Sequence, residues 1–214
     1  MHRQGLPNAL RFYFITDDSS FACPPVKQVR IALQAGATMI QYRNKSYNDD
    51  FLPEILFIRE LCEEKRVPFL VNDHLQLAQR ISADGVHLGQ DDASPAAARR
   101  ILGREAIIGI SVSTPSELRA TDLTPCDYLG TGPVFPTGTK ADAKAVKGLS
   151  GLKEIVDLSP LPVVAIGGIT AENAPACFKH GAAGVAVISF ISRAADPLAD
   201  ALRLARACGV RNSR

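Results

Sequence analysis

The chain lacks several features that would point to particular classes of protein. No apolar run approaches the roughly 18 residues that a membrane-spanning helix needs. Its 24 lysines and arginines are nearly balanced by 22 aspartates and glutamates, which leaves a net charge of +2. No basic stripe and no RNA-binding aromatic motif appears. We therefore expect neither nucleic acid nor a membrane as a partner.

Paired cysteines are also missing. The five cysteines are an odd number without a CxxC pair, and they are Cys23, Cys62, Cys126, Cys177 and Cys208. This pattern favours reduced thiols over a disulfide framework or a zinc site. The N-terminal sequence MHRQGLPNALRF has no long apolar core and no small-residue cleavage site, which argues against a signal peptide. We therefore expect a cytoplasmic protein.

What the chain does contain is a regular alternation of two kinds of segment. Short runs rich in Val, Ile and aromatic residues predict strands at 12–16, 39–42, 69–71, 85–88, 107–110, 128–130, 163–166 and 185–188. Amphipathic stretches predict helices between them, at 25–35, 50–65, 94–102, 115–120, 148–158, 171–180 and 197–207. Eight such repeats predict a (β/α)8 TIM barrel. We assign 1–214 to this one domain, with 1–10 as an N-terminal extension and 209–214 as a C-terminal tail.

An open, doubly wound sheet is the alternative architecture. It is the weaker one, because no GxGxxG follows the first predicted strand and the near-even repeat spacing favours closure. In a closed barrel, functional groups lie just past the C-terminal ends of the strands. Those positions are therefore where candidate site residues should be sought.

Three polar residues end the second predicted strand. Gln41, Arg43 and Lys45 alternate along an extended segment, so their side chains point to one side. An amide and two cations that converge at a barrel mouth suit a polyanion such as a diphosphate. A solvated strand end is the plainer alternative.

Carboxylates follow the third and fourth predicted strands. Asp73 ends one, and Asp91 and Asp92 come after the next. Carboxylates at neighbouring strand ends can share one Mg²⁺, which takes waters and substrate phosphates as its other ligands. A helix N-cap at Asp73 and a polar turn at 91–92 are the alternatives.

The remaining strand ends are rich in glycine and hydroxyl groups. The loop 130–140 reads GTGPVFPTGTK, in which threonine hydroxyls and the Lys140 ammonium suit phosphate oxygens. Gly168 and Ser189 follow the seventh and eighth strands, where barrels commonly bind a monophosphate. Ser111 is not in a GxSxG elbow, so it is interpreted as a hydrogen-bonding group and not as a nucleophile. His87, within the fourth strand, is left unassigned as a core residue.

These motifs together resemble the thiamine-phosphate synthase (thiamine-phosphate pyrophosphorylase) family. The matching segments are QYRNK (41–45), ND (72–73), ADGVHLGQDD (83–92), GISVST (109–114), GTGPVFPTGTK (130–140), VVAIGGIT (163–170) and GVAVIS (184–189). They occur in order and cover nearly the whole chain. The resemblance implies a transferase that joins 4-amino-2-methyl-5-(diphosphooxymethyl)pyrimidine to 4-methyl-5-(2-phosphooxyethyl)thiazole. The products are thiamine phosphate and diphosphate.

The resemblance also implies roles for individual residues. The pyrimidine-diphosphate site is expected at Gln41, Tyr42, Arg43, Asn44, Lys45, Asn72, Ser111 and Lys140, with Arg43, Ser111 and Lys140 as catalytic residues. The thiazole-phosphate site is expected at Thr137, Gly138, Thr139, Gly168, Ile188 and Ser189. Asp73 and Asp92 match the ligands of one Mg²⁺ per subunit. Asn44 departs from the family, in which this position is often acidic.

The implied mechanism is dissociative. The electron-rich aminopyrimidine expels Mg-bound diphosphate, and the thiazole nitrogen captures the methylene cation that remains. The expected partners are therefore small-molecule substrates. The sequence is compatible with a single chain and with a homo-oligomer. Two other functions are weighed: a thiazole tautomerase, which would need only the monophosphate site, and a non-catalytic sensor of thiamine phosphate.

Overall fold

Eight parallel strands form a closed barrel in the computed structural model, which describes residues 5–19, 22–138 and 145–210. Each strand pairs with its neighbours in chain order, and β8 pairs with β1 to complete the ring. The strands are β1 (Phe12–Ile15), β2 (Met39–Tyr42), β3 (Phe69–Asn72), β4 (Gly85–Leu88), β5 (Ile107–Ser111), β6 (Tyr128–Thr131), β7 (Val163–Ile166) and β8 (Gly184–Val187). The predicted TIM barrel is confirmed, and the open-sheet alternative is excluded.

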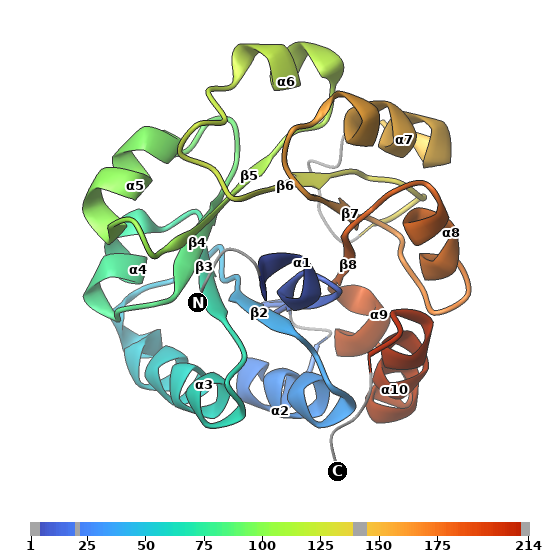
Figure 1. Cartoon of the computed structure of the whole chain (residues 1–214). Coiled ribbons are helices and arrows are strands. Elements are labelled where there is room, and N and C mark those ends of the chain that lie inside the picture. The colour runs from blue at the N-terminus through green and yellow to red at the C-terminus, as the bar shows by residue number, and fades with distance from the viewer. Residues whose placement is uncertain (1–4, 20–21, 139–144, 211–214) are drawn as a thin grey trace.

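A ring of helices covers the outside of the barrel (Figure 1). They are α2 (Pro25–Ala35), η2 (Asp49–Phe51), α3 (Leu52–Lys65), α4 (Leu75–Arg80), α5 (Pro95–Leu102), α6 (Pro115–Ala120), α7 (Gly148–Leu158), α8 (Ala174–Lys179) and α10 (Pro197–Ala207). Side-chain caps start four of them, at Asn48, Ser94, Thr114 and Asp196. The side chain of Ser94 accepts the N–H of Ala97 at 3.2 Å before α5, and Thr114 accepts that of Glu117 at 3.0 Å before α6.

The structure differs from the predicted boundaries around the last two strands. Helix α8 begins at Ala174, not at 171, because Asn173 accepts the N–H of Thr170 and keeps the intervening residues in a turn. Strand β8 ends at Val187, one position before the predicted end, since Ile188 turns the chain into the short helix α9 (Ser189–Ser192). Helix α9 was not predicted from the sequence.

The barrel buries both faces of its strands. Alternate residues such as Phe12 and Phe14 pack outward against the helices, while Tyr13 and Ile15 point into the barrel. Helix α1 (Leu6–Ala9) lies over the centre of the ring in Figure 1, at the end where the strands begin. Its apolar side chains join the interior cluster. Helix α1 therefore closes the end of the barrel where the strands begin.

No helix in the described parts of the chain is both long and apolar enough to cross a bilayer. The longest, α3, has 14 residues and carries several charges.

Candidate active site

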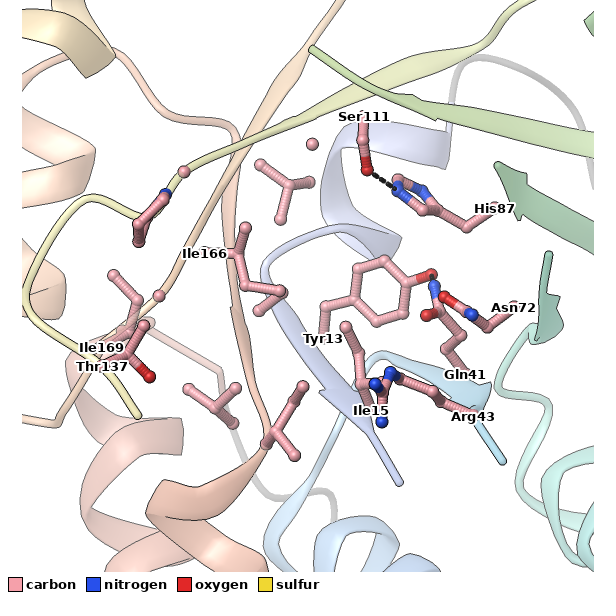
Figure 2. Close-up of a pocket in the computed structure, with 18 of the residues that line it drawn as sticks. Tyr13, Ile15, Gln41, Arg43, Asn72, His87, Ser111, Thr137, Ile166 and Ile169 are labelled. Atoms are coloured by element: carbon pink, nitrogen blue, oxygen red, sulfur yellow. Dashed lines mark hydrogen bonds between the residues drawn. The ribbon is translucent and has the colours of Figure 1, made fainter. Parts of the chain in front are cut away.

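A cavity of about 880 Å³ opens at the C-terminal ends of the strands (Figure 2). All eight strands contribute to its lining. The predicted site residues among the lining are Gln41, Arg43, Lys45, Asn72, Asp73, Asp92, Ser111, Thr137, Gly138, Gly168, Ile188 and Ser189. Thr139 and Lys140 lie outside the described residues. The fold thus brings residues from seven widely separated predicted motifs to one surface.

One side of this cavity, called here the charged wall, carries Gln41, Arg43, Lys45, Asn72, Asp73 and Asp92. Arg43 is 9% exposed, and its Nη1 donates to Asp18 Oδ1 at 3.2 Å. Its Nε is buried with no hydrogen-bond partner among the described residues. Lys45 donates from Nζ to Asp73 Oδ2 at 2.7 Å. A buried donor that lacks a partner, beside a second cation, suits the oxygens of an anionic ligand.

Tyr42 and Asn44 are not among the residues that line the cavity, so the structure does not bring their side chains together with the others assigned to the pyrimidine-diphosphate site. Side chains alternate along a strand, so the neighbours of the inward-facing Gln41 and Arg43 point outward. Tyr42 packs in the core between strands and helices, where its hydroxyl donates to Glu54 at 3.2 Å. Asn44 donates to the Tyr42 hydroxyl at 3.3 Å. Both residues support the charged wall from behind.

Asp18, in the loop after β1, was not anticipated from the sequence. One of its carboxylate oxygens accepts from Arg43, and the other accepts the backbone N–H of Lys45 at 2.6 Å. It therefore holds the side chain of one cation and the backbone of the other. No periodic pattern marks this loop, so its contacts emerge only from the folded chain.

Asp73 and Asp92 meet where β3 and β4 end. Asp73 has a φ of 62°, a strained backbone conformation for a residue with a Cβ. Burial would raise its pKa, but hydrogen bonds, first that from Lys45, hold the pKa of Asp73 below its usual value. Burial and the nearby Asp73 carboxylate raise the pKa of Asp92, although the Gly89 amide donates to it at 2.7 Å. The two carboxylates therefore repel one another when both are charged, which a bound dication would relieve.

This pair can supply only part of a metal's coordination shell. Within residues 5–19, 22–138 and 145–210, no group of three or more His, Cys, Asp or Glu side chains could hold a metal ion. Mg²⁺ is commonly held by one or two carboxylates, with waters and substrate phosphates as its other ligands. The donors at Asp73 and Asp92 thus fit Mg²⁺ that binds together with a phosphorylated ligand.

The opposite side, called here the glycine wall, carries Thr137, Gly138, Gly168, Ile188 and Ser189. Gly168 has a φ of 63°, and a Cβ there would lie 2.5 Å from the carbonyl oxygen of Pro136. The loop after β6 therefore packs directly on the loop after β7, and only glycine allows this approach. Asn173 fixes the second loop by donating to the Gly168 carbonyl at 2.9 Å. The contact places Thr137 on the same side of the cavity as Gly168.

His87, like Asp18, was not predicted from the sequence to lie in the site. It lines the cavity between the two walls, and its Nε2 lies 2.9 Å from Ser111 Oγ (Figure 2). Strand alternation could have found it. Val86 and Leu88 pack outward in the core against the helices, so the side chain between them must face the interior.

Arg193 also lines the cavity, but its charge is already engaged. Its Nε donates to Asp17 Oδ2 at 2.7 Å, and the Ser192 hydroxyl donates to the same oxygen at 2.9 Å. Burial would raise the pKa of Asp17, yet these bonds and that from the Ser19 N–H hold it below its usual value. Asp17 is only 3% exposed. Arg193 is thus half of an ion pair that fastens the loop after β1 to the loop after α9.

Comparison with known proteins decides the family. A family model described as thiamine monophosphate synthase matches residues 12–191, which span β1 to α9 and include all of the described charged and glycine walls. The chain belongs to the thiamine monophosphate synthase family. Membership confirms the resemblance found in the sequence. It also confirms the expected enzyme class, a transferase of thiamine phosphate synthesis.

Individual relatives of this family match over most of their length. The chain is 40% identical over 204 residues to thiamine-phosphate synthase of Bacillus velezensis, covering 93% of this chain and 91% of the relative. It is 43% identical over 193 residues to thiamine-phosphate synthase of Chlorobium limicola, covering 90% of each. A solved thiamine phosphate pyrophosphorylase from Pyrococcus furiosus superposes with a TM-score of 0.85 at 39% identity, covering 95% of this chain and 98% of that one.

Proposed function

We propose that this member of the thiamine monophosphate synthase family joins 4-amino-2-methyl-5-(diphosphooxymethyl)pyrimidine to 4-methyl-5-(2-phosphooxyethyl)thiazole. One observation carries the proposal: a single cavity has cations and carboxylates on one wall and glycine-rich backbone on the other. The first wall suits a diphosphate and the second a monophosphate. A reaction between a diphosphate ester and a phosphate-bearing nucleophile needs both.

On the charged wall, Gln41, Arg43, Lys45 and Asn72 would bind the pyrimidine diphosphate. The unpartnered Nε of Arg43 supports a direct contact with a phosphate oxygen. Lys45 pairs with Asp73, so a bound diphosphate would compete with that carboxylate for the ammonium group. Lys140, whose position is not described, stays assigned to the same site from the sequence alone.

Asp73 and Asp92 would hold one Mg²⁺ per subunit. When bound, the ion neutralises the diphosphate and makes it a better leaving group. Burial and the neighbouring Asp73 carboxylate raise the pKa of Asp92, which supports this assignment because a cation between the two carboxylates would relieve their repulsion. The protein supplies two ligands, which leaves the rest of the shell to the substrate and water.

On the glycine wall, Thr137, Gly138, Gly168, Ile188 and Ser189 would bind the thiazole phosphate, with Thr139 assigned from the sequence alone. The tight contact between the loops after β6 and β7 supports this role, since it fixes backbone and hydroxyl groups in one place. Such a site positions the nucleophile without contributing a strong charge.

The chemical step we propose is dissociative. The aminopyrimidine expels its diphosphate, and the thiazole nitrogen attacks the methylene cation that is left. The chain's residues then need only hold the two substrates in line and stabilise the charge on the leaving group. Arg43 and Ser111 are suited to that work, and neither has to form a covalent bond.

We further propose that the chain is a cytoplasmic enzyme that acts on small molecules, either as a single chain or as a homo-oligomer. All five cysteines are free thiols, and four of them are buried. Burial raises the pKa of Cys62 and of Cys208 to about 12, so these thiols stay protonated and unreactive. Such cysteines suit a reducing compartment.

The test is to mix purified protein, Mg²⁺ and both substrates, and to follow thiamine phosphate and diphosphate together. We expect the two products in a one-to-one ratio and a loss of both on chelation. Isomerisation of the thiazole phosphate without product would instead indicate a tautomerase. Binding of thiamine phosphate without any turnover would indicate a sensor.

A further inference from the structure

A chain of hydrogen bonds crosses the barrel interior along the lining of the cavity. Gln41 on β2 donates from Nε2 to the Tyr13 hydroxyl at 2.6 Å, and Tyr13 on β1 lies 2.9 Å from the Tyr128 hydroxyl on β6. Tyr128 lies 2.8 Å from His87 Nδ1 on β4, and His87 Nε2 lies 2.9 Å from Ser111 Oγ on β5. Five side chains from five strands are thus joined end to end, and both ends, Gln41 and Ser111, line the cavity (Figure 2).

Counting hydrogens favours one direction for this chain. A phenol has one hydrogen to donate, and both tyrosines are buried, with exposed fractions of 1% for Tyr13 and 0% for Tyr128. Tyr13 accepts from the Gln41 amide, which leaves its own hydrogen available for Tyr128, and the Tyr128 hydrogen is then available for His87 Nδ1. In that direction a neutral imidazole carries its hydrogen on Nε2, where it is donated to Ser111.

We propose that Tyr13, Tyr128 and His87 are positioning residues that hold the Ser111 hydroxyl as a hydrogen-bond donor towards the ligand. Ser111 accepts from His87, so its own hydrogen is left for an acceptor atom in the cavity, such as a ring nitrogen or a phosphate oxygen. The proposal rests on the proposed function, in which Ser111 faces the pyrimidine diphosphate.

In this direction, the Ser111–His87 pair does not act as a nucleophile and its base, although its geometry resembles one. A serine oxygen 2.9 Å from an imidazole nitrogen has the geometry of a nucleophile and its general base. A base must accept the serine hydrogen, but in the proposed direction Nε2 already carries one. The tyrosines therefore keep His87 from activating Ser111, which suits an enzyme that must not trap or hydrolyse a reactive diphosphate ester.

Two glycines show that the fold makes room for this chain. A Cβ on Gly109, two residues before Ser111, would lie 2.2 Å from Tyr128 Cζ and 2.4 Å from its hydroxyl oxygen. A Cβ on Gly130 would lie 3.1 Å from His87 Cε1. A larger residue at 109 would force the Tyr128 ring out of reach of its partners.

The direct test is the tautomer of His87 in the ¹⁵N NMR spectrum of the whole chain labelled at histidine, assigned by the signals lost in His87→Gln. We expect Nε2 to be protonated and Nδ1 to be the acceptor. In Tyr128→Phe, the two tautomers should mix because the donor to Nδ1 is gone. A hydrogen on Nδ1 in the unaltered protein would overturn the proposal, since the chain would then run from Ser111 towards Gln41.

Kinetics test the consequence. His87→Leu removes the donor to Ser111, whereas His87→Gln keeps an N–H near the Nε2 position. We expect His87→Leu to lower kcat/KM for the pyrimidine diphosphate by about tenfold and His87→Gln to restore most of it, with KM for the thiazole phosphate unchanged in both. In a Ser111→Ala background, His87→Leu should have little further effect. Equal losses for Leu and Gln, or full additivity with Ser111→Ala, would contradict a positioning role.

A control separates this proposal from the proposed function. His180→Gln alters a histidine at the C-terminal cap of α8, outside the cavity lining, and it should leave all constants unchanged. Failure of the unaltered protein to make thiamine phosphate would count against the proposed function. The tautomer of His87 would still be measurable and would decide the present proposal by itself.

Discussion

The two walls of the cavity are built from different materials. The charged wall consists of long side chains held by ion pairs, Arg43 to Asp18 and Lys45 to Asp73. The glycine wall consists of backbone held by close packing, with Gly168 against Pro136. A charge can be deleted from the first wall without moving the chain, whereas the second changes only when its backbone moves. Substitutions should therefore affect the two substrates separately.

The largest effect should come from the proposed metal ligands of the charged wall. We expect Asp92→Ala to reduce turnover on the order of 10²- to 10³-fold with the fold intact, because it removes one of the two carboxylates that would hold Mg²⁺ at the leaving group. Steady-state rates over a Mg²⁺ titration measure this. Asp200→Ala, on α10, is the control. Near-normal turnover with unchanged Mg²⁺ dependence would refute the metal assignment.

Lys140→Ala asks whether the charged wall extends onto the loop after β6. We expect a loss on the order of 10²-fold in turnover of the diphosphate substrate if the ammonium group contacts developing charge. Single-turnover rates measure the chemical step directly. Lys153→Ala, in an exposed ion pair on α7, serves for comparison. An unchanged rate constant would place Lys140 in solvent.

Gly168→Ala tests the glycine wall in the same terms. The added Cβ would meet the Pro136 carbonyl at 2.5 Å and displace the two loops. We expect KM for the thiazole phosphate to rise about tenfold, with a smaller change for the pyrimidine diphosphate. Gly103→Ala is a matched control, since Gly103 also has a positive φ but a Cβ there meets nothing within 4 Å. Equal changes for both substrates would show that the walls are not independent.

Asp18→Ala tests whether a disturbed charged wall leaves the glycine wall unaffected. Without this carboxylate, Arg43 keeps its charge but loses the contact that orients it. We expect KM for the pyrimidine diphosphate to rise about fivefold while KM for the thiazole phosphate stays constant. Asp18→Asn, which can still accept the Lys45 N–H, should give an intermediate value. A rise in both Michaelis constants would mean that the loop, not Arg43, was disturbed.

The smallest effect on activity is expected at Asp17, where the consequence is stability. The pKa of Asp17 is lowered in the folded protein, so its stabilising contribution is present above the unfolded pKa of about 4 and is lost as pH falls through the folded value. We expect Asp17→Asn to lower the free energy of unfolding by about 2 kcal/mol at neutral pH. In urea titrations the difference should shrink below pH ~4. A constant difference at all pH values would exclude the charge as its cause.

Much of the fold could be predicted because strands in a parallel barrel are buried on both faces. Met39–Tyr42, Gly85–Leu88 and Val163–Ile166 were predicted with the observed bounds, since each is an apolar run between polar or turn residues. Helix α1 was not, because four residues are too few to show a helical period. Its place depends on contacts with the barrel interior, which no local pattern encodes.

The site also has one part that local sequence patterns predict and one part that depends on contacts in the folded chain. Arg43, Lys45, Asp73 and Asp92 could be found from the sequence, because strand order places consecutive strand ends together. The bond between Tyr13 and Tyr128 joins residues 115 positions apart across the barrel. It depends on how far each strand is staggered against its neighbours, and the sequence of one strand does not state that.

Helix α1, which covers the end of the barrel where the strands begin, has a consequence for the order in which the substrates bind. Among the described residues, α1 closes the end of the barrel below Tyr13 and His87, so a ligand that binds against these two side chains has to enter before the ligand that covers it. In the proposed reaction the pyrimidine would then enter first, and the thiazole would lie between it and solvent. The methylene cation would meet the thiazole nitrogen before it met water.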